Sequence, residues 1–510
     1  MKKITKFLSH RVVLVGVSLF VQFLILLLMI TIFDRYFIYF SITSTLLSIL
    51  VVVYILSSKT NPSYKIAWVI PIIIFPIFGG LLYLFFGGNK LGKREKNKMN
   101  SIYKNYKNSY QQDEDVLQQL KKMNENAYRQ AYYINQKAFS LVYQNTVSTY
   151  FKLGEELYES MIEDLKRAKK FIFMEFFIIS EGKMWNSILK ILEDKVKEGV
   201  EVRLLYDDIG CIMTLPKGYD KMLRKKGIKC AVFNPFVPIL TKRLNNRNHR
   251  KIIVIDGKIA YTGGINLADE YINVIQKYGH WKDNGVKLEG EAVNSFTVMF
   301  LSLWDYIHNI NEDYHDFYGV NNQIEKKKDG FIIPYSDTPM DEEATAETIY
   351  LNMINRATNY IYITTPYLII DHEMMTALCN AAKSGIDVRI ITPGIPDKKI
   401  VNEVTKAYYE LLVDSGVRIY EYQPGFIHAK TFISDDQYAT IGTVNLDYRS
   451  LYLHFECGVW MYKSECIQDI LNDYRDTLKV CREITKKDCR KVGAARRLLR
   501  SILRLFAPLM

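Results

Sequence analysis

The sequence predicts an α/β protein of two pseudo-symmetric halves that share one active site, preceded by an N-terminal transmembrane region. Three observations predict this class. The first quarter of the 510 residues holds three long apolar segments without a charged side chain. The remainder contains an internal repeat of helical and strand-like segments, and each repeat ends in the same spaced set of His, Lys, Asp and Asn. A chain of this length accommodates both a membrane part and two α/β halves.

The apolar segments are long enough to cross a bilayer, because about 20 apolar residues span its hydrocarbon core. A cleaved signal peptide would have one shorter apolar region and a small-residue cleavage site. A buried core would rarely need three such runs in succession. The uncharged segments are residues 12–33, 36–56 and 66–86.

The third segment is less regular than the others. Pro71, Pro76 and the pair Gly79-Gly80 would kink a helix or let it turn back. Basic residues precede the first segment and follow the third, and both clusters favour the inner side. Three full spans cannot place both clusters on the inner side. Either the third segment is re-entrant, or one cluster lies on the outer side. We expect the catalytic part on the cytoplasmic side. Seven cysteines without regular spacing fit a reduced compartment.

The internal repeat covers most of the chain after residue 140. Residues 197–207 align with 383–393 at an offset of 186, and residues 225–235 align with 414–424 at an offset of 189. Each half therefore predicts alternating helices and short, largely buried strands that lead to a His-Lys strand and an Asn turn. The expected segments are 1–89 (transmembrane, two to three spans), 90–140 (polar helical connector), 141–320 (first half), 321–480 (second half) and 481–510 (basic amphipathic tail).

The offset falls to 179 at the histidines, so the first half carries ten extra residues between Pro235 and His249. This insertion is both apolar and basic. It is either an ordinary surface loop or a segment that lines the mouth of the site.

The duplicated motif carries the chemistry. In each half a His is followed by Lys after two residues, by Asp after seven and by Asn after seventeen. Two Lys and two Asn can hold the oxygens of a phosphodiester without a metal, and its two His can supply a nucleophile and an acid–base group. Neither half supplies both histidines, so the site needs the two halves together. The residues are His249, Lys251, Asp256 and Asn266 in the first half, and His428, Lys430, Asp435 and Asn445 in the second.

At these residues the sequence resembles the phospholipase D superfamily. The second copy continues as GTVNLDYRS, which is similar to the lipid-acting branch, and NPSYKIAW and YLFFGGNKLGKR resemble the membrane region of bacterial cardiolipin synthases. The resemblance implies two pseudo-symmetric α/β halves and a covalent phosphohistidine. By analogy His249 is the expected nucleophile, although the repeat itself does not distinguish it from His428.

Two acids are expected to orient the histidines, because a carboxylate on one ring nitrogen fixes the tautomer and stabilises the imidazolium. The family places an acid downstream of each motif, which here implies Asp283 and Glu456. The motif acids Asp256 and Asp435 either take part in catalysis or brace the local backbone. Among the other histidines, His280 and His454 are expected to pack near the proposed acids or to support them, and not to take part directly in the chemistry. No spacing typical of metal ligands is present, and neither a metal nor a cofactor is expected.

A formal net charge of +12 suits either nucleic acid or an anionic bilayer, and the apolar segments favour the bilayer. In the tail, Leu498, Leu499 and Ile502 share a helical face and Arg residues occupy much of the rest. This pattern is typical of a helix lying on an anionic membrane, the alternative being a helix packed on the protein.

The resemblance therefore implies a multi-pass bacterial membrane enzyme that joins two phosphatidylglycerols into cardiolipin and releases glycerol. Its partners would be phosphatidylglycerol and anionic lipids, with no nucleic acid. The alternatives are a phospholipase D that uses water, a phosphatidyltransferase that uses another alcohol and, more remotely, a membrane nuclease or an inactive scaffold.

Overall fold

The computed structural model describes residues 37–75, 93–107, 111–235, 245–319, 329–341 and 343–509, together with isolated positions between 20 and 87. The chain divides into two compact units. One comprises residues 1–88 with 236–242, and the other comprises residues 89–235 with 243–510. Each unit is described by itself.

The N-terminal unit contains α3 (Phe37–Ser57) and α4 (Pro62–Ile74). Helix α3 coincides with the second predicted apolar segment. Asn61 caps α4 by accepting a hydrogen bond from the backbone of Ser63, and Pro71 lies in the last turn before the helix ends. The first predicted segment and much of the third lie outside the described residues. Within the described part of the chain, no helix combines the length and apolar character needed to cross a membrane.

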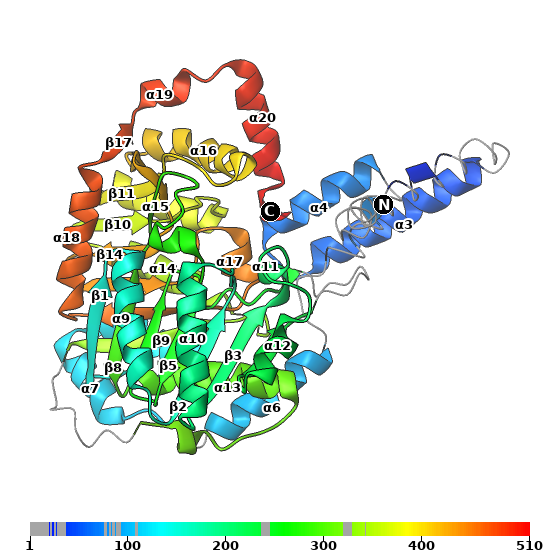
Figure 1. Ribbon diagram of the computed structural model, residues 1–510. Coiled ribbons are helices and arrows are strands. Elements are labelled where there is room, and N and C mark those ends of the chain that lie inside the picture. The colour runs from blue at the N-terminus through cyan, green and yellow to red at the C-terminus, as the bar shows by residue number, and fades with distance from the viewer. Residues whose placement is uncertain are drawn as a thin grey trace. The chain divides into compact units, whose positions relative to one another are not determined.

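The larger unit, drawn in Figure 1, contains two mixed sheets, and their strand orders repeat. The first has the order β1-β8-β6-β5-β2-β3-β4, and the second contains β9-β16-β15-β14-β10-β11-β12 with β17 added at its edge. Strands β2, β3 and β4 of the first sheet are parallel, as are β10, β11 and β12 of the second. The next strand, β5 beside β2 and β14 beside β10, runs antiparallel. This repeated order confirms the predicted pair of pseudo-symmetric α/β halves.

The strands of the first sheet are β1 (Thr146–Phe151), β2 (Phe171–Phe176), β3 (Glu201–Asp207), β4 (Lys229–Phe233), β5 (Ile252–Ile255), β6 (Ile259–Gly263) and β8 (Gly285–Gly290). Those of the second are β9 (Phe331–Asp337), β10 (Tyr360–Thr364), β11 (Asp387–Pro393), β12 (Arg418–Tyr422), β14 (Thr431–Ser434), β15 (Tyr438–Gly442), β16 (Glu456–Tyr462) and β17 (Cys481–Ile484). A separate short pair, β7 (His280–Lys282) and β13 (Gly425–Ile427), joins the two halves.

Helices cover the outer faces of both sheets. In Figure 1, α9 and α10 lie over the near face of the first sheet. One hydrophobic core lies under α9, α10 and α12, and another lies under α14, α15 and α16. A third core joins the inner faces of the two sheets around α13 and α18. These helices are α9 (Gly154–Arg167), α10 (Lys183–Lys197), α12 (Tyr219–Lys225), α13 (Val293–His308), α14 (Thr345–Arg356), α15 (His372–Lys383), α16 (Lys399–Asp414) and α18 (Cys466–Leu478).

The remaining helices precede the halves or complete them. The predicted polar connector forms α6 (Lys93–Lys107), α7 (Glu114–Met123) and α8 (Glu125–Ala138). The others are α11 (Asp208–Cys211), η3 (Asp269–Ile272), η4 (Tyr314–Phe317), α17 (Tyr448–Tyr452), α19 (Lys486–Arg490), α20 (Ala494–Leu505) and η5 (Ala507–Leu509). The insertion after Pro235 falls mostly on 236–244, outside the described residues.

The predicted C-terminal tail is more integrated with the second half than a free amphipathic tail would be. Its first residues form β17, which pairs antiparallel with β12. Helix α20 then packs along α16, where Arg496 and Arg500 both bind Glu403, at 2.8 Å for Arg500. Leu498, Leu499 and Ile502 remain exposed on the outer side of α20.

Candidate active site

The two histidines are brought to one site by backbone pairing between the halves. The segment before His428 is β13, which runs parallel to β7 of the first half. The backbone N–H of His428 donates to Lys282 at 2.7 Å, and that of His249 donates to Phe455 at 2.9 Å. Each histidine therefore lies beside the segment that leads into the acid of the opposite half.

This pairing exchanges the acids between the halves. His249 Nδ1 lies 2.9 and 3.0 Å from the two carboxylate oxygens of Glu456. His428 Nδ1 lies 2.7 Å from Asp283 Oδ2. Both acids are fully buried. The structure thus places Asp283 and Glu456 in the predicted orienting positions, and it adds that each acid serves the histidine of the other motif.

Further contacts hold the two carboxylates in place. The hydroxyl of Thr443 donates to Glu456 Oε2. The backbone N–H of Asn284 donates to Asp283 Oδ1 at 2.9 Å. With Nδ1–H donated to a carboxylate, the lone pair of each ring is on Nε2, which is the atom suited to attack or to transfer a proton.

The two lysines lie beside their histidines and are buried. Lys251 Nζ donates to the backbone oxygen of His249 at 2.7 Å. Lys430 Nζ donates to the backbone oxygen of His428 and lies 3.0 Å from its Nδ1. Burial lowers the pKa of Lys251 to about 7 and that of Lys430 to about 8.

The same environment keeps the histidines neutral. Burial, followed by the charge of Lys430, lowers the pKa of His428 to about 4 even though Asp283 opposes the shift. Burial and the charges of Lys251 and Lys430 hold the pKa of His249 well below its usual value. Burial alone would raise the pKa of Asp283, but His428 and Lys430 outweigh it and the pKa is lowered. Such a cluster of buried cationic groups favours an anionic ligand.

The asparagines occupy different positions. Asn266 Oδ1 accepts from the backbone of Ile178 at 3.0 Å, and one N–H of its amide donates to the Tyr271 hydroxyl at 2.7 Å. Asn445 is buried, and its Oδ1 has no hydrogen-bond partner among the described residues. The phosphate-binding role stays a prediction for both.

The motif aspartates do not take a catalytic position, which corrects that part of the prediction. Asp256 accepts from the backbone N–H groups of Lys169, Lys170 and Phe171 at 2.7–2.9 Å. Asp435 makes the same three contacts with residues 358–360 at 2.8–2.9 Å. Both lie at the end of the strand opposite to the histidine, so they fix the start of β2 and β10, as the structural reading expects.

Several aromatic side chains around the histidines were not anticipated. Phe177 contacts His249 edge-on with 5.1 Å between ring centroids. Tyr271 and Trp281 flank His428 at 5.7 and 5.3 Å. The repeat contained a signal for Phe177, because it directly follows a strand that aligns between the halves. Tyr271 and Trp281 carry no such pattern.

His454 lies beside the first histidine and is largely buried. Its ring centroid is 5.8 Å from that of His249, and neither of its ring nitrogens has a hydrogen-bond partner among the described residues. His249, His454 and Glu456 place ligand-type atoms within 4.8 Å of one another, a set that could hold a metal ion. His280 bonds the hydroxyl of Tyr422 at 2.9 Å, which agrees with a packing role.

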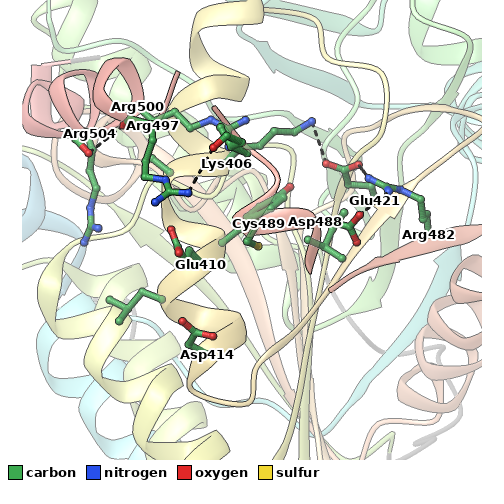
Figure 2. A pocket seen from close by; sticks show the side chains of 16 residues that line it. Lys406, Glu410, Asp414, Glu421, Arg482, Asp488, Cys489, Arg497, Arg500 and Arg504 are labelled. Carbon is green, nitrogen blue, oxygen red and sulfur yellow. Dashed lines mark hydrogen bonds and ion pairs between the residues drawn. The ribbon is translucent and has the colours of Figure 1, made fainter. Parts of the chain in front are cut away.

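A separate cavity of about 500 Å³ lies between α16, β12, α19 and α20 (Figure 2). Basic and acidic side chains both line it, and Lys406 and Arg482 bind Glu421 at 3.1 and 3.3 Å. None of the predicted site residues lines it. The cavity therefore reflects how the C-terminal segment packs and does not belong to the histidine site.

Comparison with known families agrees with this geometry. The family described as "Cardiolipin synthase, PLD-like domain" matches residues 161–304 and 350–478, one stretch in each half. The description "Phospholipase_D-nuclease N-terminal" matches residues 46–88.

Individual relatives extend over most of the chain. An uncharacterized protein of Streptococcus mutans is 46% identical over 461 residues, covering 90% of this chain and 99% of the relative. Cardiolipin synthase 2 of Bacillus anthracis is 36% identical over 455 residues, covering 88% of this chain and 87% of the relative. The crystal structure of a phosphatidylserine synthase from Haemophilus influenzae superposes with a TM-score of 0.55 at 14% identity, covering 76% of this chain and all of that chain. That last likeness concerns the fold alone.

Proposed function

The chain belongs to the cardiolipin synthase family of the phospholipase D type, and we propose that its two halves join two phosphatidylglycerols through one phosphohistidine intermediate. It is a phosphatidyltransferase that makes cardiolipin. The observation that carries the mechanism is the exchange of acids, which gives each histidine a fixed Nδ1–H and a usable Nε2.

The reaction runs in two displacements. One histidine, for which we propose His249, attacks phosphorus, so that a P–N bond forms and the P–O bond to glycerol breaks. The arriving phosphate raises the low pKa of His428, which then holds a proton and gives it to the departing glycerol oxygen. The neutral His428 next takes the proton of the terminal hydroxyl of a second phosphatidylglycerol, whose oxygen replaces the histidine on phosphorus. Lys251 and Lys430 hold the phosphate oxygens, and we propose Asn266 and Asn445 beside them.

Purified protein given phosphatidylglycerol alone tests this function. We expect cardiolipin and free glycerol in equal amounts. Phosphatidic acid with glycerol would instead identify a hydrolase, and another lipid product would identify a transferase with a different acceptor alcohol.

The activity should decline as the pH rises through about 7 to 8. In this range the buried Lys251 and Lys430 lose their charge in the free enzyme and no longer attract the phosphate. The proposed nucleophile His249 must be neutral to attack, and burial with the charges of Lys251 and Lys430 holds its pKa well below the usual value, so the acid side of the profile should lie well below neutrality. The measurement is kcat/KM against pH, which reports groups of the free enzyme. A flat profile between pH 6 and 9 would contradict the assignment.

A chelator should leave the activity unchanged, because the lysines supply the positive charge at phosphorus. His249, the Glu456 that orients its ring and the neighbouring His454 could together bind an added transition metal, which would occupy the nucleophile. We therefore expect Zn²⁺ to inhibit and EDTA to restore the rate. Loss of activity in EDTA that a trace metal restores would show that the metal is needed.

We propose that residues 1–89 anchor the enzyme in the bacterial membrane as two or three spans, with the catalytic part on the cytoplasmic side. The match of residues 46–88 to a phospholipase D N-terminal family and the uncharged segments support this. We also propose that α20 lies on the anionic bilayer, since Leu498, Leu499 and Ile502 are exposed beside arginines.

Removal of residues 1–89 should spare the chemistry and impair access to bilayer substrate, because every residue assigned to catalysis lies in the larger unit. The basic helix retains weak, salt-sensitive binding to anionic vesicles, with about 1 kcal/mol for each Lys or Arg near the surface. The comparison is full-length against truncated protein, in detergent micelles and in vesicles. A folded truncated protein without micellar activity would place the N-terminal region in the active site.

A further inference from the structure

Three loops next to the active site expose apolar side chains. They are residues 209–218, which comprise the end of α11 and the turn after it, residues 273–279 after η3, and residues 394–400, which follow β11 and include the first two residues of α16. Exposed large hydrophobic residues occur in all of them: Ile212, Met213, Val274, Ile275, Ile395 and Ile400. Met213 is the most exposed of these side chains, at 73%. Exposed apolar side chains that gather at one site are a feature of interaction surfaces, whereas scattered single ones are ordinary.

Each loop is tied to residues that contact a catalytic histidine or its Asn. In the first loop, the Thr214 hydroxyl donates to the backbone oxygen of Ile179 at 2.5 Å. Ile179 forms a bridge with Leu267, the residue after Asn266. Phe177, two residues before Ile179, packs against His249. The first loop therefore lies at the His249 side of the site.

The other two loops lie at the His428 side. The second begins two residues after Tyr271, which contacts His428. In the third, the backbone N–H of Ile395 donates to Gly425 at 3.2 Å, and Gly425 begins the strand β13 that leads to His428. The three loops thus gather at the end of the sheets where the histidines lie, and both halves contribute to them.

The loops are basic as well as apolar. Each carries exposed lysine within five residues of its apolar side chains: Lys217 in the first, Lys277 in the second, and Lys398 and Lys399 in the third. Their single acidic residue is Asp397, whose carboxylate accepts from the Tyr367 hydroxyl at 2.6 Å. Apolar tips beside exposed lysines complement a surface with negative headgroups above hydrocarbon.

We propose that these three loops are a bilayer-docking face, which inserts its apolar tips into the headgroup region of an anionic phospholipid membrane and so opens the histidine site onto its lipids. This inference rests on the proposed function for the identity of the lipid, but the docking itself is measurable without turnover.

The first test reads docking directly. Full-length Met213→Trp protein is reconstituted in phosphatidylglycerol vesicles whose acyl chains carry bromine, which quenches nearby tryptophan. The matched control is Met123→Trp, an exposed methionine at the end of α7, which lies away from α11 in Figure 1. The chain's own five tryptophans contribute equally to both proteins. Docking predicts greater quenching for Met213→Trp than for Met123→Trp, and equal quenching overturns it.

The second test reads the consequence for catalysis. The variant Met213→Glu/Ile275→Glu/Ile395→Glu is compared with Met123→Glu on vesicles and on a short-chain, monomeric phosphatidylglycerol. We expect the ratio of vesicle rate to monomer rate to fall about tenfold for the triple variant, since charge opposes insertion, and to be unchanged for Met123→Glu. An equal loss of rate on both substrates leaves the ratio unchanged, and it would assign these residues to the fold or the catalytic site and overturn the docking face. Unchanged rates on both substrates would overturn it as well.

The two proposals fail in different ways. If the unmodified protein makes no cardiolipin from either substrate, the proposed function is wrong, while the quenching difference still reports whether the loops meet the bilayer. If cardiolipin forms normally but the quenching is equal, the docking face alone is wrong.

Discussion

Replacement of His249 or of His428 by Ala should each lower cardiolipin formation by about 10⁴-fold or more, as loss of a nucleophile or of its proton partner does in other enzymes. Either substitution removes one step of the shared chemistry, because each half supplies a single catalytic histidine. The measurement is the initial rate with phosphatidylglycerol, with circular dichroism and the melting temperature as controls for folding. Near-normal activity in either variant would show that one half works alone.

A donor with a good leaving group separates the roles of the two histidines. A phosphatidyl p-nitrophenyl ester releases p-nitrophenolate without needing a general acid. If His249 is the nucleophile, His428→Ala should still release a rapid first equivalent of p-nitrophenol, whereas His249→Ala should release none. The opposite pattern would assign the attack to His428.

The second large effect concerns the exchanged acids. Glu456→Gln and Asp283→Asn should each lower turnover by about 10²–10⁴-fold, because an amide can favour the wrong tautomer and cannot stabilise the imidazolium. Since Glu456 binds His249 and Asp283 binds His428, each acid variant should reproduce the defect of the histidine in the other half. The same p-nitrophenyl donor measures this defect as the rate at which the first equivalent of p-nitrophenol is released.

Two outcomes would contradict the exchange. In one, Glu456→Gln behaves like His428→Ala and Asp283→Asn behaves like His249→Ala, which would pair each acid within its own half. In the other, both acid variants are fully active, which would make the carboxylates structural. Asp256→Asn is a matched control, because the Asp256 carboxylate, which directly follows β5, accepts from the backbone N–H groups of residues 169–171 and should affect stability more than the rate of the first equivalent.

The repeat in the sequence predicted much of the fold because aligned strands such as 171–179 and 360–368 occupy equivalent places in equivalent sheets. The pattern did not reveal β17, since Cys481–Ile484 is a short edge strand within a segment rich in basic residues. Its pairing with β12 is a long-range contact that local periodicity does not encode.

The site was predicted in its residue types and less well in its contacts. His249, Lys251, His428 and Lys430 were evident from spacing alone. The exchange of Glu456 and Asp283 was not, because it depends on the three-residue strands β7 and β13, which have no distinctive pattern and meet only in the folded protein. The bracing role of Asp256 was open in the sequence for the same reason, as its partners lie more than 80 residues earlier.

The central claim is that the two halves form one active site and not two. The most direct measurement is the amount of p-nitrophenol released in the first rapid phase, per chain of fully active protein, from a phosphatidyl p-nitrophenyl donor without an acceptor alcohol. One shared nucleophile predicts one equivalent per chain, followed by slow hydrolysis of the phosphohistidine by water. Two equivalents per chain would show that each half forms its own covalent intermediate, and the absence of a rapid phase together with full turnover would show that no such intermediate accumulates.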